Sequence, residues 1–177
     1  MLNRDSNKNI VLIGMPGVGK STVGVLLAKA LGYSFLDTDI YIQCHEGKSL
    51  QELIRQHGRS GFCDIEARYM ISISVNMHVL ATGGSVIYRR EAMQHFKING
   101  VVVHLDIELD GLKRRLGDLE ARGVVIDPGL TIDALFAERR PLYAKYADLT
   151  VRTDGLTPDQ VLRELVAQLK LRAEYPA

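Results

Sequence analysis

The sequence has few of the features that mark several classes of protein. It contains no tryptophan, only two cysteines in 177 residues, and 6% aromatic residues. Cys44 and Cys63 show no metal-ligand spacing, so we interpret both as reduced, buried thiols of a cytoplasmic protein. No apolar run approaches the ~18–20 residues of a membrane span, and the polar N-terminus does not resemble a secretory signal.

Charge of one sign is not in excess either. Lys and Arg number 22 against 21 Asp and Glu, a formal net charge of +1. Such a balance supplies no global field for a nucleic acid or an acidic membrane, and we expect neither as a partner. With 46% hydrophobic and 24% charged residues, the composition is that of one ordinary globular domain and excludes a disordered, collagen-like or coiled-coil chain.

Short apolar runs alternate along the chain with longer amphipathic segments. The pattern predicts strands at 9–14, 34–37, 78–81, 101–105 and 149–152. Helices are expected at 20–31, 49–57, 62–74, 110–116, 131–146 and 157–171. Strands that alternate with helices favour a parallel sheet covered on both faces. The fold class is therefore α/β.

Residues 14–21, GMPGVGKS, match the phosphate-binding P-loop pattern G-x-x-x-x-G-K-[ST] at every position. Glycines let backbone N–H groups converge on phosphate oxygens, and the following helix directs its positive dipole end at the same anion. The lysine supplies a point charge for the β- and γ-phosphates, and the serine hydroxyl a ligand for Mg²⁺. The expected nucleotide-binding residues here are Gly14, Gly17, Val18, Gly19, Lys20, Ser21 and Thr22.

Two aspartates, Asp37 and Asp39, follow the second expected strand. Ligands bind at the carboxyl ends of strands in open α/β sheets. One carboxylate would then serve the metal, and the other would accept the hydrogen bond of an acceptor hydroxyl before in-line attack on the γ-phosphate. The alternative is that the pair caps the next helix.

At this point the chain resembles the shikimate kinase family, small P-loop enzymes that phosphorylate shikimate with ATP. Residues 14–28 are similar to its phosphate loop and first helix, and residues 35–39 resemble its second strand with two aspartates. Residues 58–66 resemble the start of its substrate-binding helix, residues 81–84 its glycine turn, and residues 138–143 the segment after its lid.

The resemblance implies a three-layer P-loop NTPase fold, in which helices flank a five-stranded parallel sheet. It also implies a single kinase domain over residues 1–177, with a mobile lid at about 117–130. The implied catalytic residues are Lys20 and Asp39, and Ser21 and Asp37 would hold Mg²⁺. ATP would further contact Arg115 (or its neighbour Arg114), Arg122 and Pro158, and the acceptor would contact Asp39, Cys63, Gly83, Gly84 and Arg139.

The acceptor half departs from the family at three places. Cys63 stands where the family carries an arginine that clamps the substrate carboxylate, and a neutral thiol makes no bidentate charge-assisted pair. Arg59, four residues earlier, is a candidate substitute. Ser85 replaces the third glycine of the glycine turn, and the arginine motif of the family's lid is absent.

The function expected from these features is ATP-dependent phosphorylation of an alcohol, with shikimate converted to shikimate 3-phosphate. One alternative is a paralogous kinase that acts on a different hydroxylated metabolite, as Cys63 and Ser85 favour. Another is a nucleotide-binding regulatory protein without turnover. The expected partners are ATP with Mg²⁺ and a small, acidic, hydroxylated metabolite, bound by a monomer.

Overall fold

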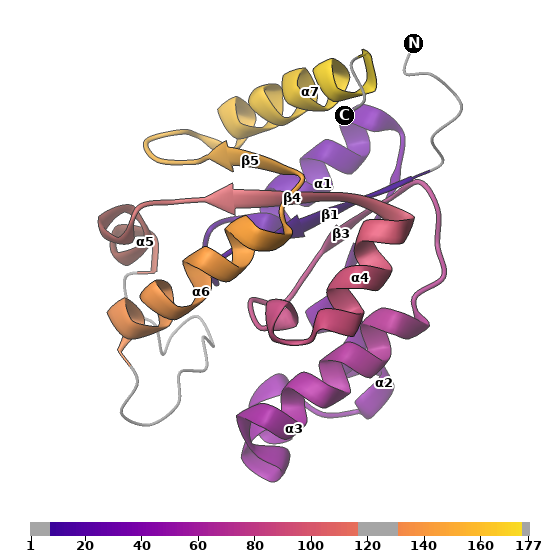
Figure 1. The fold of residues 1–177 in the computed structure, drawn as a ribbon, viewed down its shortest axis with the longest axis vertical. Coiled ribbons are helices and arrows are strands. Elements are labelled where there is room, and N and C mark those ends of the chain that lie inside the picture. The colour runs from indigo at the N-terminus through magenta and orange to yellow at the C-terminus, as the bar shows by residue number, and fades with distance from the viewer. Residues whose placement is uncertain (1–7, 117–130, 175–177) are drawn as a thin grey trace.

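Five parallel strands form one sheet at the centre of the molecule (Figure 1). The computed structural model describes residues 8–116 and 131–174. The strands are β1 (Asn9–Ile13), β2 (Ser34–Asp37), β3 (His78–Ala81), β4 (Gly100–Asp106) and β5 (Leu149–Arg152). Their order is β2-β3-β1-β4-β5, and every pairing is parallel. The five expected strands are confirmed, each to within a residue at either end.

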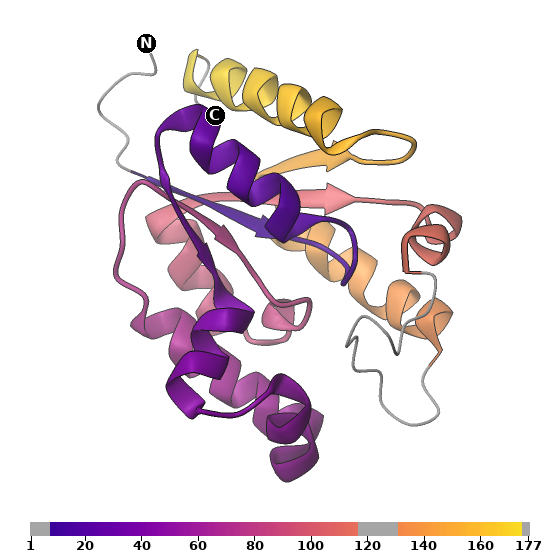
Figure 2. The same ribbon diagram turned by 180° about the vertical axis from the view of Figure 1, so that it is seen from behind.

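Helices cover both faces of this sheet. They are α1 (Lys20–Leu31), α2 (Thr38–Glu46), α3 (Leu50–Ser72), α4 (Arg90–Asn99), α5 (Leu109–Leu116), α6 (Ile132–Tyr146) and α7 (Pro158–Glu174), with a 3-10 turn η1 (Val86–Tyr88). Helices α4 and α6 lie on one face, and α1, which packs against α7, lies on the other (Figures 1 and 2). In the described part of the chain, no helix is long and apolar enough to span a membrane.

The core is dense around β1, all five residues of which are buried. A strand flanked on both edges and covered on both faces must be apolar throughout, which explains the run Ile10 to Ile13. From the helices, Leu27, Phe96 and Tyr143 are buried against the sheet. Burial of one side chain of this size stabilises the fold by about 1.5–3 kcal/mol.

The ends of the helices follow local chemistry that the sequence predicts. Helix α1 ends at Gly32, which adopts the left-handed conformation with φ 69°. Ser49 and Glu52 form a capping box at the start of α3, and Thr131 caps α6 through the backbone N–H of Ala134. These contacts satisfy backbone groups that a helix end would otherwise leave without partners.

Several expectations were wrong or incomplete. Helix α4 and turn η1 were not expected, since the run 90–99 carries only three buried apolar residues, Ala92, Met93 and Phe96. By contrast, the two helices expected at 49–57 and 62–74 are confirmed as the two segments of α3, which meet at Gly58, where φ of 67° and ψ of 175° are not helical. Cys44 is exposed rather than buried, whereas Cys63 is buried as expected.

Asn9 ties the start of β1 to the segment before β3. Its side chain is buried, donates to the Val75 carbonyl at 2.7 Å and accepts from the His78 N–H at 3.0 Å. Replacement by alanine leaves two backbone groups without partners, each worth about 1–3 kcal/mol when buried. Urea unfolding of Asn9→Ala should therefore show a loss of about 2 kcal/mol or more. The control Asn76→Ala removes an exposed side chain and should stay within ~0.5 kcal/mol of the parent; equal losses would contradict this account.

Candidate active site

The chemistry-bearing residues follow the carboxyl ends of β1, β2, β3 and β4. Residues 14–19 join β1 to α1, and three glycines of this loop have positive φ: 145° at Gly14, 78° at Gly17 and 106° at Gly19. At Gly17 a Cβ atom would also lie 2.4 Å from Cδ2 of Leu116. Only glycine meets both constraints, so the loop is held in the conformation that directs backbone N–H groups inward.

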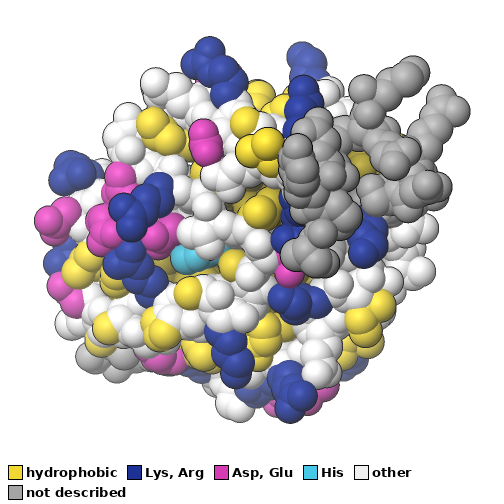
Figure 3. All heavy atoms as spheres, turned by 45° about the horizontal axis from the view of Figure 1, so that its top comes forward, with side chains coloured by type: hydrophobic (Ala, Val, Ile, Leu, Met, Phe, Trp, Pro, Cys, Tyr) yellow, Lys and Arg dark blue, Asp and Glu magenta, His cyan; other side chains and the backbone are white. Residues whose placement is uncertain are grey.

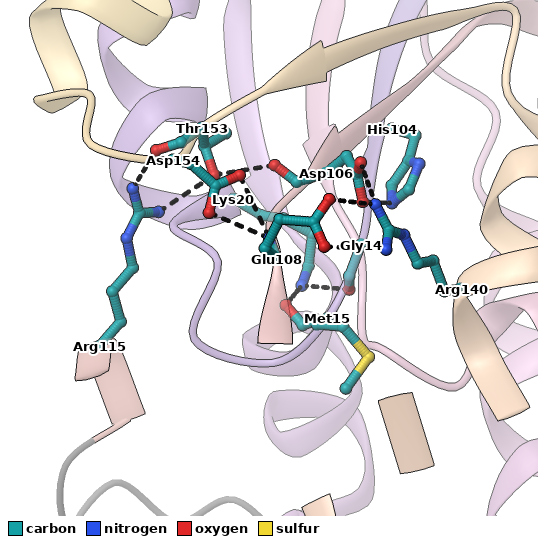
Figure 4. A network of polar contacts seen from close by, with 10 residues as sticks. All are labelled: Gly14, Met15, Lys20, His104, Asp106, Glu108, Arg115, Arg140, Thr153 and Asp154. Atoms are coloured by element: carbon teal, nitrogen blue, oxygen red, sulfur yellow. Dashed lines mark hydrogen bonds and ion pairs between the residues drawn. The ribbon is translucent and has the colours of Figure 1, made fainter. Parts of the chain in front are cut away.

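Lys20 lies at the centre of this loop (Figure 4). Its ammonium group donates to the carbonyls of Gly14 at 2.8 Å and Met15 at 2.9 Å. Burial lowers the pKa of Lys20 to about 8, and the nearby carboxylates Asp39 and Asp37 act in the opposite sense. A desolvated cation that is held by two neutral carbonyls is strongly stabilised when a phosphate group binds beside it. A nucleotide site requires such an arrangement.

The Asp37 carboxylate caps the next helix, one of the two roles that the sequence left open, and it also contacts Ser21. One oxygen, Oδ1, accepts from the N–H groups of Asp39 and Ile40 and so caps α2. The other, Oδ2, accepts from the Ser21 hydroxyl at 2.6 Å. A hydroxyl and a carboxylate in contact are hard oxygen ligands that fit Mg²⁺, which takes few protein ligands beside water and phosphate. Accordingly, residues 8–116 and 131–174 contain no cluster of three metal-binding side chains.

Arg115 lies between the P-loop and the segment that follows β5 (Figure 4). Its guanidinium donates to the carbonyl of Val18 at 2.8 Å and to Thr153. Arg114 is exposed, so of the two arginines it is Arg115 that contacts the P-loop. Pro158 starts α7 after this segment and is exposed. Arg122 and the expected lid, 117–130, lie outside the described residues.

Next to the P-loop, Arg140 stabilises the end of β4 (Figure 4). It donates to Asp106 at 3.1 Å and to Glu108 at 2.7 Å, and these contacts raise the pKa of Arg140 and lower that of Glu108. His104 of the same strand is buried, and burial lowers its pKa to about 4. Arg140, Asp106 and Glu108 thus form a structural brace at the end of β4. On the molecular face drawn in Figure 3, positively and negatively charged side chains are interspersed.

Two glycines mark the acceptor half of the site. A Cβ atom on Gly83 would lie 2.4 Å from Oε1 of Glu66 and 2.7 Å from Oδ1 of Asp39, and one on Gly84 would lie 2.8 Å from Nη1 of Arg139. The backbone here is therefore closely surrounded by charged groups. Burial, aided by the Asp37 carboxylate, raises the pKa of Asp39 to about 6. The structure thus brings Asp39, Gly83, Gly84 and Arg139 together, as expected.

Tyr88 joins two arginines at the edge of this pocket. Its hydroxyl accepts from Nε of Arg139 at 3.0 Å and also from Nη2 of Arg59. Arg139 is 7% exposed, and no carboxylate in the described chain lies within ion-pair distance of it. Arg59 in addition pairs with Glu138 at 2.8 Å. A buried guanidinium without a carboxylate partner provides a site for an anion.

Cys63 and Ser85 do not replace the missing arginine. Burial raises the pKa of the Cys63 thiol, which is therefore neutral at physiological pH. The Ser85 hydroxyl donates to Oε2 of Glu66 at 2.7 Å. Glu66 and Tyr88 are site residues that the sequence reasoning did not assign. For Glu66 the available signal was its position one helical turn after Phe62, on the buried face of α3.

The fold and this loop define a P-loop NTPase of the kind that transfers phosphoryl groups to small molecules. The family model for shikimate kinase matches residues 16–170. A shikimate kinase from Persephonella marina is 36% identical over 165 residues, covering 92% of this chain and 99% of its own. One from Salinispora tropica is 38% identical over 161 residues, covering 90% and 96%.

Solved structures agree with the sequence relatives. Shikimate kinase from Acinetobacter baumannii, in complex with shikimate, is similar with a TM-score of 0.80 and 30% identity, over 95% of this chain and 95% of that chain. The chain belongs to the shikimate kinase family. Members of this family generally use ATP with Mg²⁺.

The position of Lys20 predicts the effect of removing it. Lys20→Met deletes a charge-assisted contact worth about 1.5–3 kcal/mol, so the Kd for ATP should rise about ten- to a hundredfold. Isothermal titration calorimetry measures this directly. Lys29→Met, an exposed lysine of the same helix, is the matched control. An unchanged Kd in the Lys20 variant would exclude Lys20 from the nucleotide site.

Proposed function

We propose that this protein transfers the γ-phosphoryl group of ATP to the 3-hydroxyl of shikimate. The hydroxyl oxygen forms a bond to the γ-phosphorus as the bond to the β,γ-bridging oxygen breaks, and the hydroxyl proton passes to the Asp39 carboxylate, so that shikimate 3-phosphate and ADP are released. The observation that carries the proposal is that Asp39 and the buried Arg139, which has no carboxylate of the described chain within ion-pair distance, lie at adjacent glycines of one turn. Family membership supports the same reaction.

On the nucleotide side, the P-loop N–H groups and Lys20 would bind the phosphates, and Arg115 with Pro158 would contact the adenine end. Ser21 and Asp37 would hold Mg²⁺, which when bound neutralises charge on the β- and γ-phosphates. Lys20 then offsets negative charge that grows on the transferring group, in a buried position where such an interaction is strong.

On the acceptor side, Asp39 would accept the hydrogen bond of the reacting hydroxyl and orient it. Arg139 would hold the substrate carboxylate, and Arg59, brought beside it by Tyr88, would supply a second positive charge. The kink at Gly58 starts a new helical segment at Arg59. That position supports Arg59 as the substitute for the arginine that Cys63 replaces.

Residues 1–177 would form one kinase domain, which would act as a cytoplasmic monomer on ATP and a small acidic metabolite. The one parallel sheet and its covering helices support the single domain. The interspersed surface charge (Figure 3) and net charge of +1 support small-molecule partners.

A coupled assay of ADP release with Mg-ATP tests the reaction, with shikimate beside a panel of other hydroxy acids and polyols. Stimulation by shikimate above the ATPase background is expected. A second candidate, a kinase for a different acceptor, is favoured by the buried neutral thiol of Cys63 and gains if another compound is preferred. ATP binding without turnover on any acceptor would instead support a regulatory protein.

Asp39 provides a test of the acceptor half alone. Asp39→Asn keeps the shape of the side chain but accepts the hydroxyl proton poorly, so kcat should fall about 10²- to 10⁴-fold. The Kd for ATP should change little. Asp64→Asn, whose carboxylate pairs with Arg89 outside the pocket, is the control and should keep its kcat. A comparable fall in both variants would contradict the assigned role.

Arg59 and Cys63 form the second test. Arg59→Gln should raise the KM for shikimate about ten- to a hundredfold, since one charge-assisted contact is lost. Cys63→Arg in the Arg59→Gln background should recover much of that loss, because the charge returns from the neighbouring helical turn. Arg68→Gln is the control, because Arg68 lies on the same helix as Arg59 and is exposed in an ion pair with Glu46 of α2. If neither Arg59→Gln nor the added Cys63→Arg changes the KM for shikimate, an anion site at this position is excluded.

A further inference from the structure

Tyr88, the last residue of turn η1, lies against two guanidinium groups that come from different helices. Cζ of Arg59, on α3, lies 4.7 Å from the centre of the Tyr88 ring, and Cζ of Arg139, on α6, lies 5.3 Å from it. An aromatic ring attracts a cation at such a distance through its quadrupole. The half-buried ring therefore holds together two positive charges that otherwise repel each other.

The hydroxyl group of Tyr88 gives this arrangement a direction. Its oxygen accepts from Nη2 of Arg59 and from Nε of Arg139 at 3.0 Å. Burial raises the pKa of Tyr88, and a hydrogen bond with Glu138 adds to the rise; the same bond is the main reason that the pKa of Glu138 is lowered. A tyrosine hydroxyl has one proton to donate, and here it accepts twice as well. Three side chains consequently fix its position.

The two arginines differ in how their charge is balanced. Arg59 pairs with Glu138 at 2.8 Å. Arg139 is instead oriented by neutral hydroxyl groups, that of Tyr88 and that of Tyr143, with which it also forms a hydrogen bond. Two guanidinium groups and one carboxylate leave a net charge of +1. Such a cluster fits a ligand group with a single negative charge, as one carboxylate has.

The cost of ordering Arg59 explains why a fixed hydroxyl group matters. Arg59 reaches the site from the non-helical position that follows Gly58. A long side chain that becomes ordered only when a ligand arrives reduces the affinity for that ligand, and a side chain that is already held does not. Contacts with Tyr88 and Glu138 order Arg59 in the protein without acceptor.

Resting on the proposed function, we propose that Tyr88 is a positioning residue, which holds Arg59 and Arg139 in the arrangement that binds the carboxylate of the acceptor. Tyr88 acts through the two arginines and takes no part in the transfer of the phosphoryl group. Its removal should therefore change the binding of the acceptor carboxylate and leave the chemical step in place.

Tyr88→Phe keeps the ring and removes the hydroxyl group. With ATP saturating, the KM for shikimate should rise about tenfold, the factor that one charge-assisted hydrogen bond is typically worth. The kcat should stay within about twofold of the parent, because Lys20 and Asp39 are unchanged. A fall in kcat with an unchanged KM would overturn the assigned role.

Tyr69 provides a matched control, since it makes the same kinds of contact without any of the acceptor residues assigned above. Its hydroxyl donates to Glu46 at 2.8 Å, Glu46 pairs with Arg68 at 2.9 Å, and Cζ of Arg68 lies 5.3 Å from the centre of the Tyr69 ring. Tyr69→Phe should keep the KM and kcat of the parent. An equal rise of KM in both variants would show a general effect of losing a tyrosine hydroxyl and would overturn the proposal.

A double-mutant cycle tests whether Tyr88 acts through Arg59. The effects of Tyr88→Phe and Arg59→Gln should overlap, so the rise in KM of the double variant should be clearly smaller than the product of the two single rises. Because Tyr88 also contacts Arg139, the double variant should still bind shikimate more weakly than Arg59→Gln alone. A rise equal to the product would mean that the two residues act independently, which contradicts the proposal.

Calorimetric titration separates this inference from the proposed function, because it needs no turnover. Shikimate and its neutral carboxamide, each titrated into protein saturated with ADP, differ in the group that the two arginines would bind. Tyr88→Phe should raise the Kd for shikimate about tenfold and leave the Kd for the carboxamide unchanged. An unchanged Kd for ADP verifies that the variant is folded.

Each other result of the titration has a definite meaning. Equal weakening of both compounds, or of neither, would overturn the inference even if shikimate is phosphorylated. The expected pattern of Kd values without phosphorylation of shikimate would support the role of Tyr88 and overturn the proposed function. A parent protein that binds neither compound would overturn both.

Discussion

Parallel hydrogen bonding of β1 between β3 and β4 is the constraint on which the rest of the structure depends. Leu12 pairs with Ala81, and Ile13 with His104, while Asp37 of β2 pairs with the same Ala81. All carboxyl ends consequently meet at one edge of the sheet. The loops that leave this edge carry the P-loop, Asp37, Gly83 and the brace around Asp106, so residues far apart in sequence share one site.

The two halves of that site differ in the groups that surround their buried charged side chains. In the nucleotide half, the Lys20 ammonium is held by carbonyl oxygens, which leave its charge available to an anion. In the acceptor half, a buried guanidinium and two carboxyl groups lie around a turn of two glycines. Burial is the main cause of the raised pKa values of Asp39 and Glu66, and a neighbouring carboxylate adds to it: Asp37 for Asp39, and Asp39 for Glu66.

Much of this could be predicted from the sequence because local rules suffice for it. The β-branched strand, the glycine loop and the capped helices are encoded within a few residues, and they led to the fold and to Lys20 and Asp39. Residues whose role depends on long-range contacts were not accessible in this way. Tyr88 lies 29 positions from Arg59 and 51 from Arg139, and no spacing rule connects them. Helix α4 was missed because its apolar stripe is short, and the Ser85 contact with Glu66 arises only when η1 packs against α3.

The Asp37 carboxylate has a consequence for how the two substrates affect each other. One of its oxygens holds Ser21 and the other holds the first turn of α2, which carries Asp39. A ligand that moves Oδ2 of Asp37 away from Ser21 therefore also moves Oδ1, which accepts the hydrogen bond of the Asp39 N–H. The two binding equilibria are thereby linked through a single residue, and such linkage is reciprocal: whatever the first ligand does to the affinity for the second, the second does equally to the first.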